Sequence, residues 1–258
     1  MNKKEQKVKD VLTNSRPPLF EQDFPIIFFW SPKSGCTSLI KWFYYQIGKL
    51  DEALKHNPWV HTYRLQVYQK QPKYLYRIAE QLLFNKKESY KLVRNPYTRA
   101  VSSYLAAIYN ETLLDQIAPG AKGTGISFKE FLYKVKEIGA DNPKLDPHIA
   151  QQYIKDEELF VKNHIRLENF TEEIRNLEQK FKLQNSPLHE FVKSPHHLTQ
   201  AMQSNGRQTF SDVKFSRQTI KTPLPDYTDF YNEETKKLVQ ELFKNDFIHY
   251  GYDVERIK

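Results

Sequence analysis

Two short apolar runs, each followed by a polar turn, organise the hydrophobic pattern of this 258-residue chain. In the first run, residues 26–30 (IIFFW), every position is apolar, which is typical of a parallel strand buried on both faces. The second run, residues 90–93, ends at Arg94. Apolar residues recur at helical spacing after each run, so the pattern predicts an α/β fold with a central, mostly parallel sheet.

The helical segments follow from the same pattern. The first helix is predicted to begin with Thr37 or Ser38 as its cap. Residues 50–88 are predicted to be mostly helical, and a short strand near residues 164–167 leads into a helix over residues 170–181. Together these elements predict a three-layer sandwich in which helices flank the sheet.

The predicted domain organisation is a single domain over residues 23–258, preceded by a flexible basic arm at residues 1–22. No apolar stretch approaches the ~20 residues that a membrane-spanning helix needs. The N-terminus lacks the apolar core of a signal peptide, and the single cysteine excludes an internal disulfide. These features favour a soluble, cytoplasmic protein without a transmembrane segment.

The turn after the first apolar run reads PKSGCTS, residues 32–38. Lys33 supplies a positive charge, Gly35 lets an anion approach the main chain, and the first amides of the following helix are unpaired donors. In the common nucleotide loop the lysine follows the second glycine, whereas Lys33 here precedes Gly35. The motif predicts a pocket for a phosphate-bearing ligand, with an ordinary strand–turn–helix carrying a surface lysine as the alternative.

A second polar turn, RNPYTRAVSSY at residues 94–104, follows the second apolar run. Arg94 stands at the carboxyl end of a predicted strand, where ligands gather in open α/β sheets. Its guanidinium can hold a phosphate through two parallel hydrogen bonds, and Ser102, about two turns further on, can add a hydroxyl to the same anion. The alternative is a capped helix that carries solvated arginines.

Together the two motifs resemble those of the sulfotransferases that use 3′-phosphoadenosine 5′-phosphosulfate (PAPS), and most closely the carbohydrate branch of that family, whose animal members are anchored in the Golgi membrane. The family pattern K-x-G-x-T is met at residues 33–37, and the pattern R-x-P-x-x-R-x-x-S-x-Y at residues 94–104. The resemblance extends from Phe24 to Asp253. It identifies the chain as similar to a soluble, bacterial-style member of the family.

The resemblance implies the P-loop-kinase-like fold of the sulfotransferases. It also implies transfer of a sulfuryl group from PAPS to a hydroxyl of a carbohydrate or glycoconjugate acceptor, by in-line displacement, with release of adenosine 3′,5′-bisphosphate and no metal requirement. Lys33 would stabilise the charge on the departing 5′-phosphate. The implied donor-binding residues are Lys33, Ser34, Gly35, Cys36, Thr37 and Ser38 for the 5′-phosphosulfate, and Arg94 and Ser102 for the 3′-phosphate.

An acceptor hydroxyl needs a general base, and histidine titrates in the right range. Of the eight histidines, two are candidates. His61 lies in a zone where some family members keep a catalytic histidine, and His148 lies in DPHIAQQ, a segment that the resemblance assigns to the active-site region. In that segment Ile149 and Gln151 replace the usual tryptophan and proline of the family. The sequence does not choose between the two histidines, and a structural role is the alternative for each.

The predicted anion-binding turn, residues 32–38, is the anion loop. Cys36 is interpreted as a small residue on this loop. Because a helix N-terminus favours the charged form of a thiol, Cys36 is expected to have thiolate character. Its alkylation is then expected to inactivate the protein by blocking the pocket.

Residues 185–228 lack clear periodicity and predict loops that contact the acceptor or the adenosine, with disorder as the alternative. His189, His196 and His197 fall in this segment. They could suggest a metal, but no second cluster with ligand spacing supports one, so a polar loop is favoured.

The net charge of +8 and the isoelectric point near 9.2 suit anionic ligands. The resemblance implies that the positive charge serves to bind the anionic donor and an acidic saccharide, and not nucleic acid. Two other functional classes remain open. An ATP-dependent small-molecule kinase is disfavoured by the lysine order and by the lack of an acidic strand end for a metal. A non-catalytic polyanion-binding module would explain the charge, but not the presence of both motifs.

Overall fold

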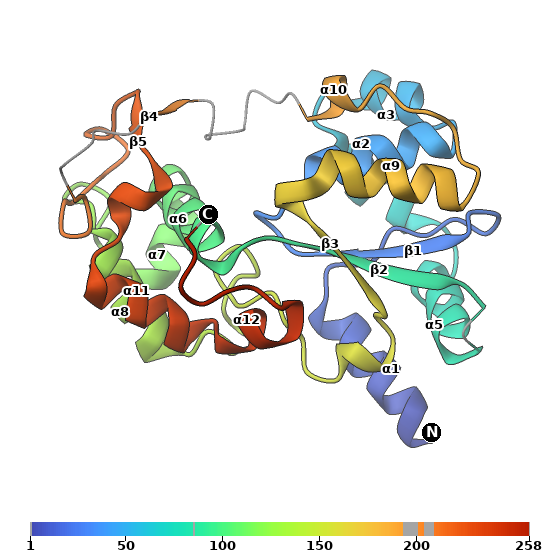
Figure 1. Cartoon of the computed structure of the whole chain (residues 1–258), viewed down its shortest axis with the longest axis horizontal. Helices are drawn as coiled ribbons and strands as arrows, with labels where there is room; N and C mark the ends of the chain where they lie inside the picture. The colour runs from blue at the N-terminus through green and yellow to red at the C-terminus, as the bar shows by residue number, and fades with distance from the viewer. Residues whose placement is uncertain (1, 85, 193–200, 204–208, 258) are drawn as a thin grey trace. The chain divides into compact units, whose positions relative to one another are not determined.

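The computed structural model describes residues 2–84, 86–192, 201–203 and 209–257 (Figure 1). The chain divides into two compact units. Unit 1 comprises Met1–Val93 and Ile154–Ser194, and unit 2 comprises Arg94–Tyr153 and Pro195–Lys258. Each unit has its own hydrophobic core. The single domain over residues 23–258 stays a prediction.

The central sheet lies in unit 1. Its strands β1 (Ile26–Trp30), β2 (Glu88–Val93) and β3 (Asn163–Arg166) follow one another in that order and are all parallel. All five residues of β1 are buried, as its continuous apolar run predicts. Trp30 is aligned with Leu92, and Val93 with Arg166. The carboxyl ends of the three strands therefore lie at one edge of the sheet.

Helices cover both faces of this sheet and confirm the predicted layered α/β fold. In Figure 1, α2 (Cys36–Gln46) and α9 (Phe170–Lys180) lie on one face, and α1 (Lys3–Asn14) and α5 (Tyr74–Phe84) on the other. On the first face, Trp42 of α2 donates its indole N–H to Glu178 of α9 over 2.9 Å. Burial alone would raise the pKa of Glu178, but hydrogen bonds from Ser186, Trp42 and Arg175 lower it.

The N-terminal segment, predicted to be a flexible arm, is folded in this structure. Helix α1 begins with a capping box formed by Asn2 and Glu5. Leu19 then forms an antiparallel bridge with Phe28 of β1. The arm interpretation missed three apolar residues at helical spacing among the lysines, because the charged positions dominate the composition. The buried residues are Val8, Val11 and Leu12.

The remaining elements of unit 1 are short and connect the layers. They are α3 (Leu50–His56), α4 (Val60–Gln66), η1 (Tyr68–Lys70), η2 (Glu157–Leu159), η3 (Leu167–Asn169) and α10 (Leu188–Phe191). The helical content predicted for residues 50–88 is confirmed by α3, α4 and α5.

A buried ion pair joins the sheet of unit 1 to η2. Lys91 Nζ lies 2.5 Å from Glu157 Oε2, and the two side chains are 1% and 2% exposed. We expect Glu157→Gln to lower the free energy of unfolding by about 3–5 kcal/mol, because it leaves a buried ammonium without its carboxylate. Urea denaturation measures the loss.

Glu80→Gln is the matched control for this change. It breaks the Lys86–Glu80 pair, whose side chains are 50% and 41% exposed, and should cost less than about 1 kcal/mol because water screens the two charges. Equal losses in the two variants would show that burial of the Lys91 pair has no energetic consequence.

Unit 2 is built mainly from helices. They are α6 (Pro96–Tyr109), α7 (Glu111–Ile117), α8 (Phe128–Ile138), η5 (Tyr227–Phe230), α11 (Glu233–Leu242) and α12 (Lys244–Tyr250), together with a short parallel pair, β4 (Met202–Gln203) and β5 (Leu224–Pro225). Its core includes edge-to-face contacts of Phe128 with Tyr104 and Phe230. Among the described residues of both units, no helix is long and apolar enough to span a bilayer.

Candidate active site

The polar turn after β1 forms a tight loop that leads directly into α2. Lys33 and Gly35 both have left-handed backbone conformations, with φ of 70° and 84°. Gly35 is the N-cap of α2, and no side chain caps the helix. The predicted cap at Thr37 or Ser38 was wrong. A capping hydroxyl would occupy the first amides of the helix, whereas a glycine leaves them available to an anion.

A side chain at Gly35 would strain this loop in two ways. Its φ of +84° disfavours any residue with a Cβ atom, and a Cβ there would overlap Leu167 Cδ1. We expect Gly35→Ala to lower the free energy of unfolding by about 2–3 kcal/mol. The control is Gly48→Ala, where φ is +67° and nothing lies within 4 Å of the added Cβ, so only the backbone cost of about 1 kcal/mol is expected. Equal losses in urea denaturation would mean that Leu167 moves aside freely.

Ser38 stabilises the start of α2 through contacts within the protein. Its hydroxyl donates to the carbonyl of Phe191 over 3.0 Å, and its amide donates to the carbonyl of Gly35 over 3.1 Å. These bonds differ from the predicted contact of Ser38 with the phosphosulfate. Ser34 is fully buried, while Lys33 is partly exposed.

Helix α4 brings His61 to the anion loop. His61 Nε2 lies 3.2 Å from Thr37 Oγ1 and 3.7 Å from Cys36 Sγ. The ring also packs against Trp59, with 4.7 Å between centroids, and meets Trp30 at 6.0 Å. The side chain is only 9% exposed. Of the two candidate histidines, His61 is the one that unit 1 places beside the loop.

Arg64, one turn after His61 on the same face of α4, was not singled out by the sequence motifs. It is 4% exposed, and its guanidinium carbon lies 4.8 Å from the centre of the Trp30 ring. Its Nη1 donates to Gln69 Oε1 over 2.9 Å. The signal that could have found it is the spacing of His61 and Arg64, which puts a cation within one turn of the histidine.

Cys36 does not have the predicted thiolate character. Burial raises its pKa above the ordinary thiol value, and the nearby charges of Lys33 and Arg64 and the amides of the first turn offset this only in part. The thiol is therefore protonated at neutral pH. The helix N-terminus does act in the predicted direction, but the loss of solvent around the sulfur outweighs it.

In unit 2, the Arg94 guanidinium is held by two hydroxyl groups. Its Nε donates to Thr98 Oγ1 over 3.0 Å, and its Nη2 donates to the Tyr227 hydroxyl over 2.7 Å. The guanidinium also lies over the Tyr227 ring at 5.1 Å. Gln152 fixes the backbone, since its side chain accepts from the Arg94 amide over 2.9 Å and donates to the Arg94 carbonyl over 2.8 Å.

Other positions of the second motif have distinct roles within unit 2. Thr98, a hydroxyl partner of Arg94, lies on α6, and Ser102 follows it by four residues. The two side chains therefore lie on the same face of the helix. Arg99 is 1% exposed and donates to the carbonyls of Ala150 and Pro147, and burial lowers its pKa to about 10. Tyr104 donates to the Ile126 carbonyl over 2.8 Å. Arg99 and Tyr104 therefore stabilise the fold of unit 2.

His148 has a local partner in unit 2. Its Nδ1 lies 2.7 Å from Asp146 Oδ1, and the His148 side chain is 40% exposed. The Asp146 carboxylate also accepts from the amide of His148 over 2.8 Å, which closes a tight turn. This turn accounts for the sequence order Asp146-Pro-His148 without reference to catalysis.

The segment of residues 185–228, predicted to form loops, is described only in part. It contains α10, β4 and β5. His189 is exposed and lies 3.7 Å from Glu190, whereas His196 and His197 lie outside the described residues. Over the described parts of the chain, no three histidine, cysteine or acidic side chains are placed to share a metal ion.

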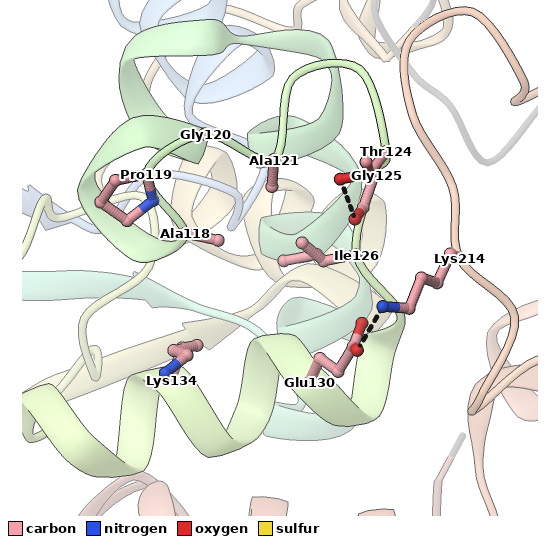
Figure 2. Close-up of a pocket in the computed structure, with 10 residues that line it drawn as sticks. All are labelled: Ala118, Pro119, Gly120, Ala121, Thr124, Gly125, Ile126, Glu130, Lys134 and Lys214. Atoms are coloured by element: carbon pink, nitrogen blue, oxygen red, sulfur yellow. Dashed lines mark hydrogen bonds and ion pairs between the residues drawn. The ribbon is translucent and has the colours of Figure 1, made fainter.

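Figure 2 shows a pocket of about 290 Å³ in unit 2, between the loop that follows α7 and the first turns of α8. Lys214 closes one side through an ion pair with Glu130 over 2.7 Å. The rest of the lining is mostly small, including Gly120, Ala121 and Gly125. None of the predicted donor or acceptor residues lines this pocket.

The parallel sheet, whose first strand leads through a lysine-bearing loop into an uncapped helix N-terminus, defines an α/β protein with a candidate anion site at that loop. Residues 18–253 match the model of the sulfotransferase family. The chain belongs to this family, and the match includes the whole stretch from Phe24 to Asp253 over which a resemblance to sulfotransferases was predicted. Comparisons with curated proteins and with solved structures find no match.

Proposed function

We propose that the protein transfers the sulfuryl group of PAPS to a hydroxyl group of a carbohydrate or glycoconjugate acceptor. The observation that carries this proposal is the loop of Lys33 and Gly35 at the uncapped N-terminus of α2, with His61 against the first turn of that helix. Sulfotransferase family membership supplies the reaction class. The donor and the acceptor class are our inference.

The 5′-phosphosulfate binds the loop of unit 1 in this proposal. The amides of Cys36 and Thr37 donate to its oxygens, because the first amides of a helix have no acceptor within it. Lys33 neutralises the negative charge that develops on the bridging oxygen as the bond to sulfur breaks. The acceptor oxygen attacks from the opposite side and displaces the 5′-phosphate in line.

The 3′-phosphate binds Arg94 in unit 2. Thr98 and Tyr227 hold the guanidinium, so little side-chain freedom is lost when the anion arrives. Ser102, on the same face of α6 as Thr98, adds a hydroxyl donor. This scheme includes no metal ion, because a sulfuryl group carries less negative charge than a phosphoryl group.

His61 is the proposed general base, and His148 serves as the control. We expect His61→Ala to lower the rate of sulfuryl transfer by about 10²–10⁴-fold, because the acceptor hydroxyl loses the group that takes its proton. His148→Ala should change the rate less than about threefold, since its ring is engaged by Asp146. The comparison is made at saturating donor, and the reverse order of effects would transfer the assignment to His148.

The experiment that tests the proposed function is an acceptor screen with PAPS. Neutral, carboxylated and partly sulfated polysaccharides are supplied in parallel, and release of adenosine 3′,5′-bisphosphate is measured with and without a metal chelator. Acceptor-dependent release that the chelator leaves unchanged supports the proposal.

Two other outcomes would replace the proposed function. Thermal stabilisation by ADP with Mg²⁺, but not by the bisphosphate, would identify a kinase. Salt-sensitive binding of sulfated polymers without turnover would identify a polyanion-binding module.

A further inference from the structure

A buried cation behind the anion loop is not accounted for by the proposed binding scheme. Arg64 is 96% shielded from solvent and stacks on Trp30, the last residue of β1. Gln69 orients one end of the guanidinium, and its own side chain donates to the Pro17 carbonyl over 3.2 Å. Arg64 forms no ion pair with a carboxylate in the part of the chain that the structure describes.

The polar atoms near this guanidinium are unusually poor in partners. Arg64 Nε, Trp30 Nε1 and Tyr44 Oη are all buried and, over the described residues, make no hydrogen bond. The first two atoms can only donate, so what the cluster lacks is acceptors and negative charge. Buried polar groups without a hydrogen-bond partner are few in folded proteins, so three in one cluster need an explanation.

Among the residues that the structure describes, no neighbouring side chain supplies the missing negative charge. Burial raises the pKa values of Tyr44 and Tyr74 well above the ordinary tyrosine value, so both phenols are neutral. Burial also raises the pKa of the Cys36 thiol. The titratable groups around Arg64 and Cys36 are Lys33 on the loop, His61 on α4, Tyr44 on α2, Tyr74 on α5 and Arg16 ahead of β1.

We propose that Arg64 is a positioning cation of the donor site, which acts through the first turn of α2 to raise the positive potential of the anion loop. Arg64 is too deeply buried to reach a polymeric acceptor. Its charge acts across the low-dielectric interior, where a cation several ångströms away still interacts strongly. Arginine suits this role because it stays protonated when burial lowers its pKa. The consequence of this inference for donor binding rests on the proposed function. The effect of Arg64 on the potential of the anion loop does not.

Cys36 provides a direct readout of the potential at the loop without any ligand. It is the chain's single cysteine, and its thiol is coupled to the charges of Lys33 and Arg64. The rate of alkylation by iodoacetamide follows the thiolate fraction, and its pH profile yields the thiol pKa. We expect Arg64→Gln to slow alkylation at pH 8 by about fivefold or more, because the thiolate loses a nearby positive charge. Arg64→Lys should restore most of the rate.

Arg77 supplies the matched control. It also lies over an aromatic ring, that of Phe20 at 5.8 Å, donates to a glutamine, Gln71, and has an unpartnered buried Nε. Its charge is not among those that act on the Cys36 thiol. Arg77→Gln should therefore leave the alkylation rate within about twofold of the wild type. If Arg64→Gln fails to fold, Arg64→Met keeps an unbranched apolar stem over Trp30 and removes the charge.

The consequence for the donor site is read from the affinity for PAPS. If Arg64 raises the positive potential of the loop, Arg64→Gln should weaken PAPS binding several-fold, and Arg64→Lys should restore most of the affinity. An unchanged thiol profile in Arg64→Gln, or an equal change in Arg77→Gln, would overturn the proposal. Failure of the wild-type protein to bind PAPS would refute the proposed function instead, and the alkylation comparison would still decide the role of Arg64.

Discussion

Replacing Lys33 by glycine is expected to lower the rate of sulfuryl transfer by about 10²–10³-fold while the chain stays at least as stable as the wild type. The variant loses the charge that stabilises the departing phosphate, but the backbone strain at residue 33 is relieved. Lys33 has φ of 70°, a conformation that costs a residue with a Cβ atom and costs glycine nothing. Unlike Lys33→Ala, this variant therefore separates the loss of charge from any loss of fold. Turnover at saturating PAPS and urea denaturation are measured on the same samples.

Lys182→Gly is the control for the backbone effect. Lys182 also has a positive φ, of 53°, and stands just after the end of α9, where glycine is favoured. Its replacement should raise the free energy of unfolding by up to about 1 kcal/mol and leave turnover unchanged. Transfer by Lys33→Gly within threefold of the wild-type rate would exclude the proposed role of Lys33 in the transition state.

Replacing Arg94 by alanine is expected to weaken binding of adenosine 3′,5′-bisphosphate by about 100-fold or more, because a buried phosphate would lose its charged, pre-oriented donor. Adenosine 5′-phosphate lacks the 3′-phosphate, so its affinity should be nearly the same in Arg94→Ala and the wild type. The ratio of the two affinities, measured by calorimetry, reports the 3′-phosphate contact alone. Any general disturbance of the fold affects both ligands and cancels in this ratio.

The neighbouring serines of α6 sharpen the test of the Arg94 site. Ser102 is the proposed hydroxyl donor, and the Ser103 hydroxyl is buried without a partner in the described structure. Ser102→Ala should reduce bisphosphate affinity several-fold, while Ser103→Ala should leave it unchanged because no bond is lost. A bisphosphate that binds Arg94→Ala as tightly as the wild type would show that the second motif does not hold the 3′-phosphate.

The sequence by itself determined the layered α/β fold, the strand at residues 26–30 and the family. These features depend on local signals. Five consecutive apolar residues satisfy a strand that is buried on both faces, and the two motifs are contiguous stretches of chain whose residue order is specific. Helix α1 was missed because its three buried positions are sparse among charged residues, so that composition outweighed periodicity.

Only the tertiary structure decided how the loop starts α2 and what surrounds it. Whether Gly35 or Thr37 caps the helix depends on a left-handed backbone and on the nearby Leu167, more than a hundred residues away in the chain. The placement of His61 against Thr37 and the burial of Arg64 over Trp30 depend on how α4 packs on the end of β1. Packing of this kind is a long-range property that short motifs do not encode. For Cys36 it reversed the expectation of a lowered thiol pKa, because desolvation raises this pKa more than the helix N-terminus lowers it.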